Sequence, residues 1–82
     1  MTDEIRQIIK DHARLSVDVE EISDDDDLYL AGMTSHASVN VMIALEDHFD
    51  VEFPDAMLTR STFESIGALA AAIAQMQMGA SV

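Results

Sequence analysis

Apolar residues recur at three- and four-residue spacing in three segments of the chain, which is the period of a helix with one buried face. The first segment spans residues 3–15, and the residues on its expected inner face are Ile5, Ile8, Ile9, His12 and Leu15. Thr2 or Asp3 can cap its start. The pattern predicts an N-terminal helix with His12 half buried.

A second helix is predicted over residues 35–49. The residues expected in its buried stripe are Val39, Met42, Ile43, Leu45 and Phe49, and those expected to face solvent are Asn40, Glu46 and Asp47. Pro54 disfavours a helical conformation for Phe53, so the helix should end before that point. We expect only one helical turn through residues 55–59, capped by Asp55.

A last helix is predicted from Phe63 to about Met76. Ser61 and Glu64 have the spacing of a capping box, with Thr62 as the rival cap. The expected core residues are Phe63, Ile66, Leu69, Ala70 and Ile73. The final four residues have no periodicity, so we expect one domain over residues 1–78 and a flexible tail over residues 79–82.

Residues 16–34 lack a helical period and are predicted to form a long loop. Its expected apolar anchors are Val17, Val19, Ile22, Leu28, Tyr29 and Leu30. A loop of this length in a compact domain is usually functional. Asp24 to Asp27 do not form an EF-hand, because such a loop would need Gly near Tyr29 and Glu near Thr34. We expect a solvated acidic loop that turns at Gly32.

Charge narrows the classes of partner. The net charge is −12, and residues 15–59 contain twelve Asp or Glu and no Lys or Arg. Nucleic acids and anionic membranes bind through Lys and Arg, so neither is an expected partner. An acidic surface instead attracts basic protein partners.

The size and composition of the chain exclude several kinds of catalytic and metal site. A chain of 82 residues buries only about 60–65% of the surface of its unfolded form, which disfavours a deep catalytic cavity. There is no cysteine, so thiolate metal sites and disulfides are excluded. The acidic N-terminus lacks the charge of a signal peptide, and no apolar run could span a bilayer. We expect a cytoplasmic, monomeric protein without a metal.

Ser35 is the best candidate for a chemically used atom. It stands where the loop meets the second helix, beside unpaired backbone N–H groups and the positive end of the helix dipole, so a phosphodiester on its oxygen would be stabilised. Ser35 could instead be only an N-cap, and Thr34 or Ser38 could compete with it. His36 suggests a hydrolase, but neither a Gly-x-Ser-x-Gly motif nor an oxyanion pocket is present. We therefore expect no enzymatic activity.

The order of these features resembles the acyl carrier protein family over nearly the whole chain. The matching parts are a Gly-x-x-Ser step ending at Ser35, the helix end Ala44-Leu45-Glu46-Asp47-His48-Phe49, and Glu52-Phe53-Pro54-Asp55. The resemblance implies an all-α four-helix bundle with a long loop between the first two helices and a short third helix. It also implies that Ser35 receives a covalent 4′-phosphopantetheine arm from coenzyme A, whose thiol holds an acyl group as a thioester.

Three residues depart from the common pattern of the family. Thr34 replaces the usual Asp, His36 an apolar residue, and Asn40 the Glu of fatty-acid carriers. The Thr-Ser-His sequence is similar to that of carriers charged with an amino acid by ligases related to seryl-tRNA synthetases. The resemblance thus favours an aminoacyl cargo.

The resemblance implies three partners: a phosphopantetheinyl transferase, a loading ligase and a downstream acyl-transferring enzyme. The residues expected to bind them are Met33, Thr34, His36, Asn40, Glu46, Asp47 and Met57. The alternative is an unmodified carrier-like module that binds a basic partner through the acidic face of the second helix.

Overall fold

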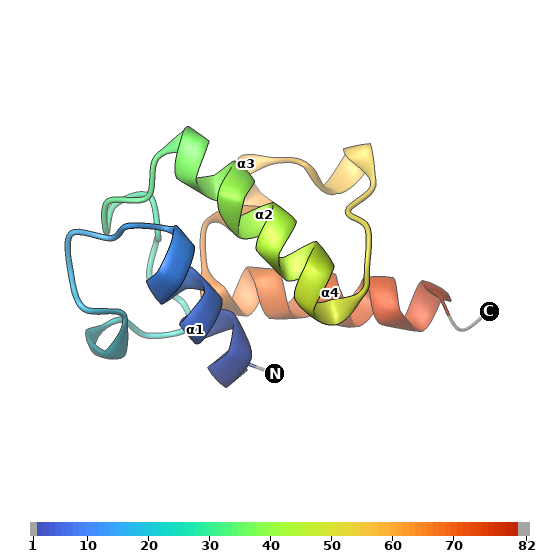
Figure 1. Ribbon diagram of the computed structural model, residues 1–82, viewed down its shortest axis with the longest axis horizontal. Coiled ribbons are helices and arrows are strands. Elements are labelled where there is room, and N and C mark those ends of the chain that lie inside the picture. Colours follow the sequence, from blue (N-terminus) through green and yellow to red (C-terminus); the bar gives the residue numbers. More distant parts are fainter. Residues whose placement is uncertain (1, 81–82) are drawn as a thin grey trace.

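The fold is all-α over residues 2–80, the part of the chain that the computed structural model describes, and side chains are described for residues 2–78. Its helices are α1 (Thr2–His12), α2 (Ser35–Phe49), α3 (Arg60–Phe63) and α4 (Ile66–Ala80), with 3₁₀ turns η1 (Val19–Glu21) and η2 (Asp55–Met57). Helix α1 packs against both α2 and α4, and the short α3 packs against α4 (Figure 1). This is the expected four-helix arrangement, with a long α1–α2 loop.

One apolar core joins the three long helices and the loop. Its fully buried large side chains are Ile5, Ile9, Leu28, Val41, Leu45, Ile66, Leu69 and Ile73. Burying each such side chain contributes roughly 1.5–3 kcal/mol. The core thus fixes the loop as well as the helices, because Leu28 lies within it.

Helix α1 ends one turn earlier than predicted. Its last residue is His12, and the chain turns at Arg14, whose φ of 54° lies in the left-handed region. Ala13 closes the helix by donating a hydrogen bond to the carbonyl of Ile9 at 2.8 Å. Leu15 therefore reaches the core from the loop, and His12 is exposed rather than half buried.

Helix α2 has the predicted bounds but a different rotation. Its buried residues are Ala37, Val41 and Leu45, whereas Val39 is 48% exposed and Ile43 is 55% exposed. Apolar residues lie all around this helix, so their spacing does not determine which face is buried. The prediction that Val39 and Ile43 belong to the core is wrong. The helix ends as expected, at Phe49, with Asp50 in the left-handed conformation.

The last helix starts later than predicted, and the short third helix precedes it. Helix α3 ends at Phe63, and the Ser65 hydroxyl starts α4 by accepting a hydrogen bond from the N–H of Ala68 at 3.0 Å. The N-cap of the last helix is therefore Ser65, and the prediction of Ser61 or Thr62 is wrong. Helix α4 continues to Ala80, past the expected end at Met76. Of the expected tail, residues 81–82 lie outside the described residues.

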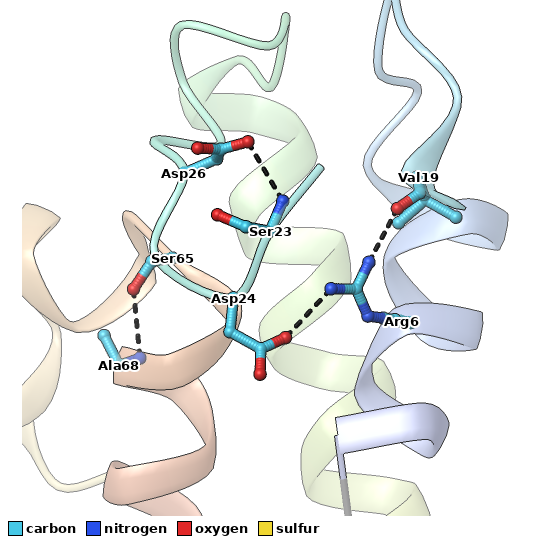
Figure 2. Close-up of polar contacts among 7 residues, drawn as sticks. All are labelled: Arg6, Val19, Ser23, Asp24, Asp26, Ser65 and Ala68. Carbon is cyan, nitrogen blue, oxygen red and sulfur yellow. Dashed lines mark hydrogen bonds and ion pairs between the residues drawn. The ribbon is translucent and has the colours of Figure 1, made fainter. Parts of the chain in front are cut away.

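The acidic loop is tied to α1 by side-chain contacts of Arg6 (Figure 2) and to α4 by a backbone hydrogen bond. The Arg6 guanidinium donates to the Val19 carbonyl at 2.7 Å and to the Asp24 carboxylate at 2.9 Å. The carbonyl of Asp24 in turn accepts from the N–H of Gly67 at 2.9 Å. These hydrogen bonds hold the loop backbone against the two helices.

Three carboxylates of the acidic run, those of Asp24, Asp26 and Asp27, accept hydrogen bonds within the protein, although Asp24 to Asp26 are exposed as predicted. Asp26 accepts from the N–H of Ser23, and Asp27 accepts from the N–H of Tyr29. The predicted anchors Val19, Ile22 and Leu28 are buried, but Val17 and Leu30 are exposed, which corrects the prediction for those two residues.

Candidate functional site

The start of α2 presents an exposed serine next to a residue that caps the helix. Thr34 is the N-cap, and its hydroxyl accepts a hydrogen bond from the N–H of Ala37 at 3.0 Å. Ser35 is the first helical residue and is exposed. Because Thr34 provides the cap, the Ser35 side chain is not needed for this purpose.

Gly32 sets the approach of the chain to this helix. Its φ is +117°, and a Cβ at this position would lie 2.8 Å from the backbone nitrogen of Ser16. Ser16 holds the turn by donating from both its N–H and its hydroxyl to the Ala31 carbonyl, each at 2.9 Å. The predicted turn at Gly32 is confirmed.

Among the three neighbouring hydroxyls, only that of Ser35 makes no hydrogen bond within the described residues. The Thr34 hydroxyl accepts from Ala37, and the Ser38 hydroxyl donates to the Ser35 carbonyl at 2.7 Å. The geometry therefore separates Ser35 from both of its rivals.

The Ser35 side chain lines a surface groove of about 350 Å³, which we call the Ser35 groove. Its residues are Ser35, Ser38, Val39 and Met42 on one side, and Tyr29, Leu58, Thr59, Arg60 and Phe63 on the other. The floor and walls are largely apolar, and Arg60 supplies the positive charge. A group attached to Ser35 thus has a partly apolar surface beside it.

The residues predicted to bind partners are not all available to do so. Met33 is only 3% exposed and belongs to the core, so it presents no side chain to a partner. Met57 is half buried in η2 and packs against the core. Thr34 is exposed but is occupied as the helix cap.

His36 and Asn40 lie on the exposed side of α2, as predicted. Together with Arg14 and Thr34 they line a second hollow, of about 380 Å³, on the other side of the helix start from the Ser35 groove. They are placed to contact a protein that approaches Ser35.

Glu46 and Asp47, predicted as equivalent acidic contacts, have different surroundings. Glu46 is half buried and accepts a hydrogen bond from the N–H of Phe53 at 2.8 Å. Asp47 is exposed and borders a hollow between α1 and α2. Only Asp47 has a carboxylate free of such a structural contact.

Sequence reasoning missed most residues of the Ser35 groove and the exposure of Ile43 on α2. Val39 and Ile43 were assigned to the core, and Tyr29 and Arg60 were not assigned to the site. For Arg60, the sequence did offer an indication, because it is the only Lys or Arg after residue 14. No such signal existed for Val39 and Ile43, since only the packing sets the rotation of α2.

The described residues form neither a cluster of metal ligands nor a membrane-spanning helix. No group of three or more His, Asp or Glu side chains is placed to hold a metal ion within residues 2–78. No helix in the described part of the chain is long and apolar enough to cross a membrane.

Comparison with known proteins identifies the family of this chain. The family described as "Phosphopantetheine attachment site" matches residues 3–73. An aminoacyl carrier protein of Agrobacterium fabrum (strain C58) is 46% identical over 65 residues, which are 79% of this chain and 78% of that protein.

Solved structures agree with this family at the level of the fold. One match is in the crystal structure of an engineered Bradyrhizobium japonicum glycine:carrier protein ligase complexed with a carrier protein from Agrobacterium tumefaciens and AMP. It has a TM-score of 0.88 and 42% identity, covering 90% of this chain and 99% of the matched chain.

The holo acyl carrier protein of Nitrosomonas europaea, solved by NMR, has a TM-score of 0.81 and 28% identity, covering 94% of this chain and 95% of its own. The predicted fold and the resemblance to carrier proteins are confirmed. From the match over residues 3–73 and the close relative, the chain belongs to the family of carrier proteins with a phosphopantetheine attachment site.

Proposed function

We propose that Ser35 carries the 4′-phosphopantetheine arm and that the arm holds an amino acid as a thioester. The observation that carries this proposal is the exposed Ser35 hydroxyl, which makes no hydrogen bond among the described residues while those of Thr34 and Ser38 do. A transferase joins the Ser35 oxygen to the phosphopantetheine of coenzyme A; the pyrophosphate bond of coenzyme A breaks, 3′,5′-ADP leaves, and the serine proton passes to a base of the transferase. The carrier then supplies a nucleophile and a tether, and the chemistry belongs to its partners.

The relatives support an aminoacyl cargo over a long acyl chain. One relative is named an aminoacyl carrier protein, and a structural match at 42% identity comes from a complex with a glycine:carrier protein ligase. The Ser35 groove is an open surface feature of about 350 Å³. A long acyl chain gains about 0.8 kcal/mol per buried methylene, whereas a small amino acid needs no such shelter. The proposed loading partner is therefore a ligase that activates glycine or another small amino acid.

The partner surface proposed here is the exposed face of α2 that begins beside Ser35. His36, Val39, Asn40 and Ile43 are exposed on it, and Asp47 lies about one turn beyond Ile43. Half-exposed apolar side chains with a few charges at the edge are typical of transient protein interfaces. The transferase, the ligase and a downstream acyl-transferring enzyme would use this face in turn. The expected cytoplasmic location and monomeric state remain part of the proposal.

Intact-protein mass spectrometry tests the attachment. Apo protein incubated with coenzyme A and a broad-specificity phosphopantetheinyl transferase should gain the mass of one arm. Ser35→Ala should gain none, and the matched control Ser38→Ala should gain the arm normally. An unchanged mass for the unsubstituted chain with every transferase tried would refute the proposal.

A second reaction tests the cargo. Holo protein incubated with ATP, a glycine:carrier protein ligase and single amino acids should gain one aminoacyl mass, which hydroxylamine should remove because the bond is a thioester. Loading by fatty acids and a fatty acyl ligase, but by no amino acid, would contradict the aminoacyl assignment.

The alternative function is an unmodified module that binds a basic partner. The same variants distinguish it from the carrier. Partner capture that survives Ser35→Ala and is lost on Asp47→Lys would favour the module, whereas capture that depends on the arm favours the carrier.

A further inference from the structure

Arg60 has an unusual position in this chain. It is the only Lys or Arg after residue 14, in a protein of net charge −12. Its side chain lines the Ser35 groove, opposite the start of α2. The only Lys or Arg of the C-terminal 68 residues therefore borders the groove that contains the proposed attachment serine.

Two contacts hold the Arg60 side chain in this place. Its guanidinium carbon lies 4.2 Å from the centre of the Tyr29 ring, in a cation–π contact. The Asp27 carboxylate is 3.8 Å from a guanidinium nitrogen. Asp27 also accepts hydrogen bonds from the N–H groups of Tyr29 at 2.8 Å and Leu30 at 3.3 Å, so it orients the loop that carries the ring.

These contacts leave the hydrogen-bond donors of Arg60 unused. The distance to Asp27 exceeds hydrogen-bond range, and Arg60 makes no hydrogen bond to the described residues. The side chain is 64% exposed, so its donors are accessible from the groove. A guanidinium group presents five N–H donors in a geometry that matches phosphate oxygens.

We propose that Arg60 binds the phosphodiester of the arm on Ser35 and so lays pantetheine along the Ser35 groove. The inference rests on the proposed attachment at Ser35. The phosphodiester carries one negative charge. Arg60 is the cation that borders the groove lined by Ser35, the proposed attachment residue. The N-terminus of α2 favours the same charge from the opposite side. Pantetheine then lies against the apolar side chains of Val39, Met42 and Leu58.

This contact gives the arm two positions. With Arg60 engaged, the arm lies along the protein. A partner that offers its own cation to the phosphodiester displaces Arg60 and releases the arm into the partner's active site. Arg60 is exposed, so dissolved ions screen its attraction to the phosphodiester and the contact can be exchanged.

NMR spectroscopy of the holo protein tests this inference. Isotope-filtered NOEs should connect the geminal methyl groups of pantetheine with the methyl groups of Val39 and Leu58. The Nε–H signal of Arg60 should shift between the apo and holo forms. In holo Arg60→Gln the NOEs should be lost and the ³¹P signal should move toward that of a free phosphodiester. Arg60→Lys keeps the positive charge but lacks the planar set of N–H donors of a guanidinium group. In this variant the NOEs should be weakened rather than lost.

The control is Arg14→Gln, which removes the same charge from an exposed residue of the other hollow. It should keep the NOEs and the ³¹P shift of the unsubstituted holo protein. Amide spectra of each apo variant show that the fold is unchanged. Equal arm NOEs in Arg60→Gln and the unsubstituted protein, or an Nε–H signal that does not respond to the arm, would overturn the inference.

The mass measurement separates this inference from the proposed function. If Ser35 never gains an arm, the proposed function itself fails. If the arm is added to Ser35 but Arg60→Gln leaves its NOEs unchanged, only the role of Arg60 is wrong.

Discussion

At the scale of the residue, two adjacent hydroxyls at the start of α2 differ in their hydrogen bonds. The Thr34 hydroxyl caps the N-terminus of the helix, whereas the Ser35 hydroxyl makes no hydrogen bond among the described residues. A threonine at the position where related carriers usually have aspartate keeps an oxygen that can cap the helix. It omits the negative charge that an aspartate would place beside the phosphodiester proposed on Ser35.

Thr34→Ala should destabilise the protein by about 1 kcal/mol, because it removes the N-cap hydrogen bond to Ala37. Ser35→Ala should change the free energy of unfolding by less than about 0.5 kcal/mol, because its hydroxyl bonds to nothing among the described residues. Urea unfolding of the two apo variants measures both effects. A larger loss for Ser35→Ala than for Thr34→Ala would show that Ser35 is the cap.

Glu46 and Asp47 give a second residue pair with different tasks. Glu46→Ala should cost about 1–2 kcal/mol, because it leaves the N–H of the buried Phe53 without its acceptor. Asp47→Ala should cost less than about 0.5 kcal/mol. Thermal unfolding checks the stabilities, and Glu46→Gln, which keeps an acceptor, should recover part of the loss. Equal stabilities of the two Ala variants would contradict this division.

At the scale of the element, the rotation of α2 decides which of its apolar residues are buried in the core and which are exposed at the surface. Leu45 is fully buried, while Ile43, two positions earlier, is 55% exposed. Residues two positions apart on a helix differ in direction by about 200°, so these two side chains lie on nearly opposite faces. The exposed apolar residues of α2 therefore form a surface beside Ser35.

Leu45→Ala should cost about 2–5 kcal/mol through lost burial and the cavity left behind. Ile43→Ala should change the free energy of unfolding by less than about 0.5 kcal/mol, but it should raise the KM of the holo carrier for its loading ligase. Urea titration and loading kinetics measure the two readouts. A Leu45→Ala variant as stable as Ile43→Ala would contradict the rotation of α2 described above.

The α1–α2 loop depends on an arginine of the neighbouring helix. Arg6→Met should destabilise the protein by about 1–2 kcal/mol, because it removes two hydrogen bonds to the loop, one of them to a half-exposed carboxylate. Lys10→Met is the matched control, since it removes the same charge from an exposed position of α1. Comparing the two cancels the change in net charge. Equal loss in both variants would mean that Arg6 acts only through its charge.

At the scale of the whole molecule, self-repulsion is the dominant electrostatic property. Sixteen acidic residues and four Lys or Arg leave a net charge of −12 on a body with principal extents of 39 × 22 × 20 Å. Such a charge opposes the compact state, and dissolved ions screen it. The arm adds further negative charge to this surface.

Raising the KCl concentration from roughly 10 mM to roughly 500 mM should increase the melting temperature, because the Debye length falls from about 30 Å to a few ångströms. Differential scanning calorimetry measures the shift, and the Lys10→Met variant, with one more net negative charge, should show a larger one. A melting temperature that falls with salt would mean that local ion pairs such as Arg6–Asp24 outweigh the repulsion.

The sequence by itself determined the local features of this protein. Helix periodicity, Pro54 and Gly32 placed the bounds of α2 and the turns on either side of it. The Gly-x-x-Ser step indicated the serine, because these signals depend on a few neighbouring residues whose backbone preferences act without distant contacts. The charge pattern likewise needs no fold to be recognised, because it is a property of the residues themselves.

Tertiary structure decided whatever depends on which surfaces meet. The rotation of α2 came from its packing on α1, since its apolar residues point in all directions. The early end of α1, the cap at Ser65 and the burial of Met33 followed from how the loop fits between helices. Arg60 and Tyr29 reached the Ser35 groove for the same reason. Residues distant in sequence become neighbours only after the core has formed, so no local pattern records their contact.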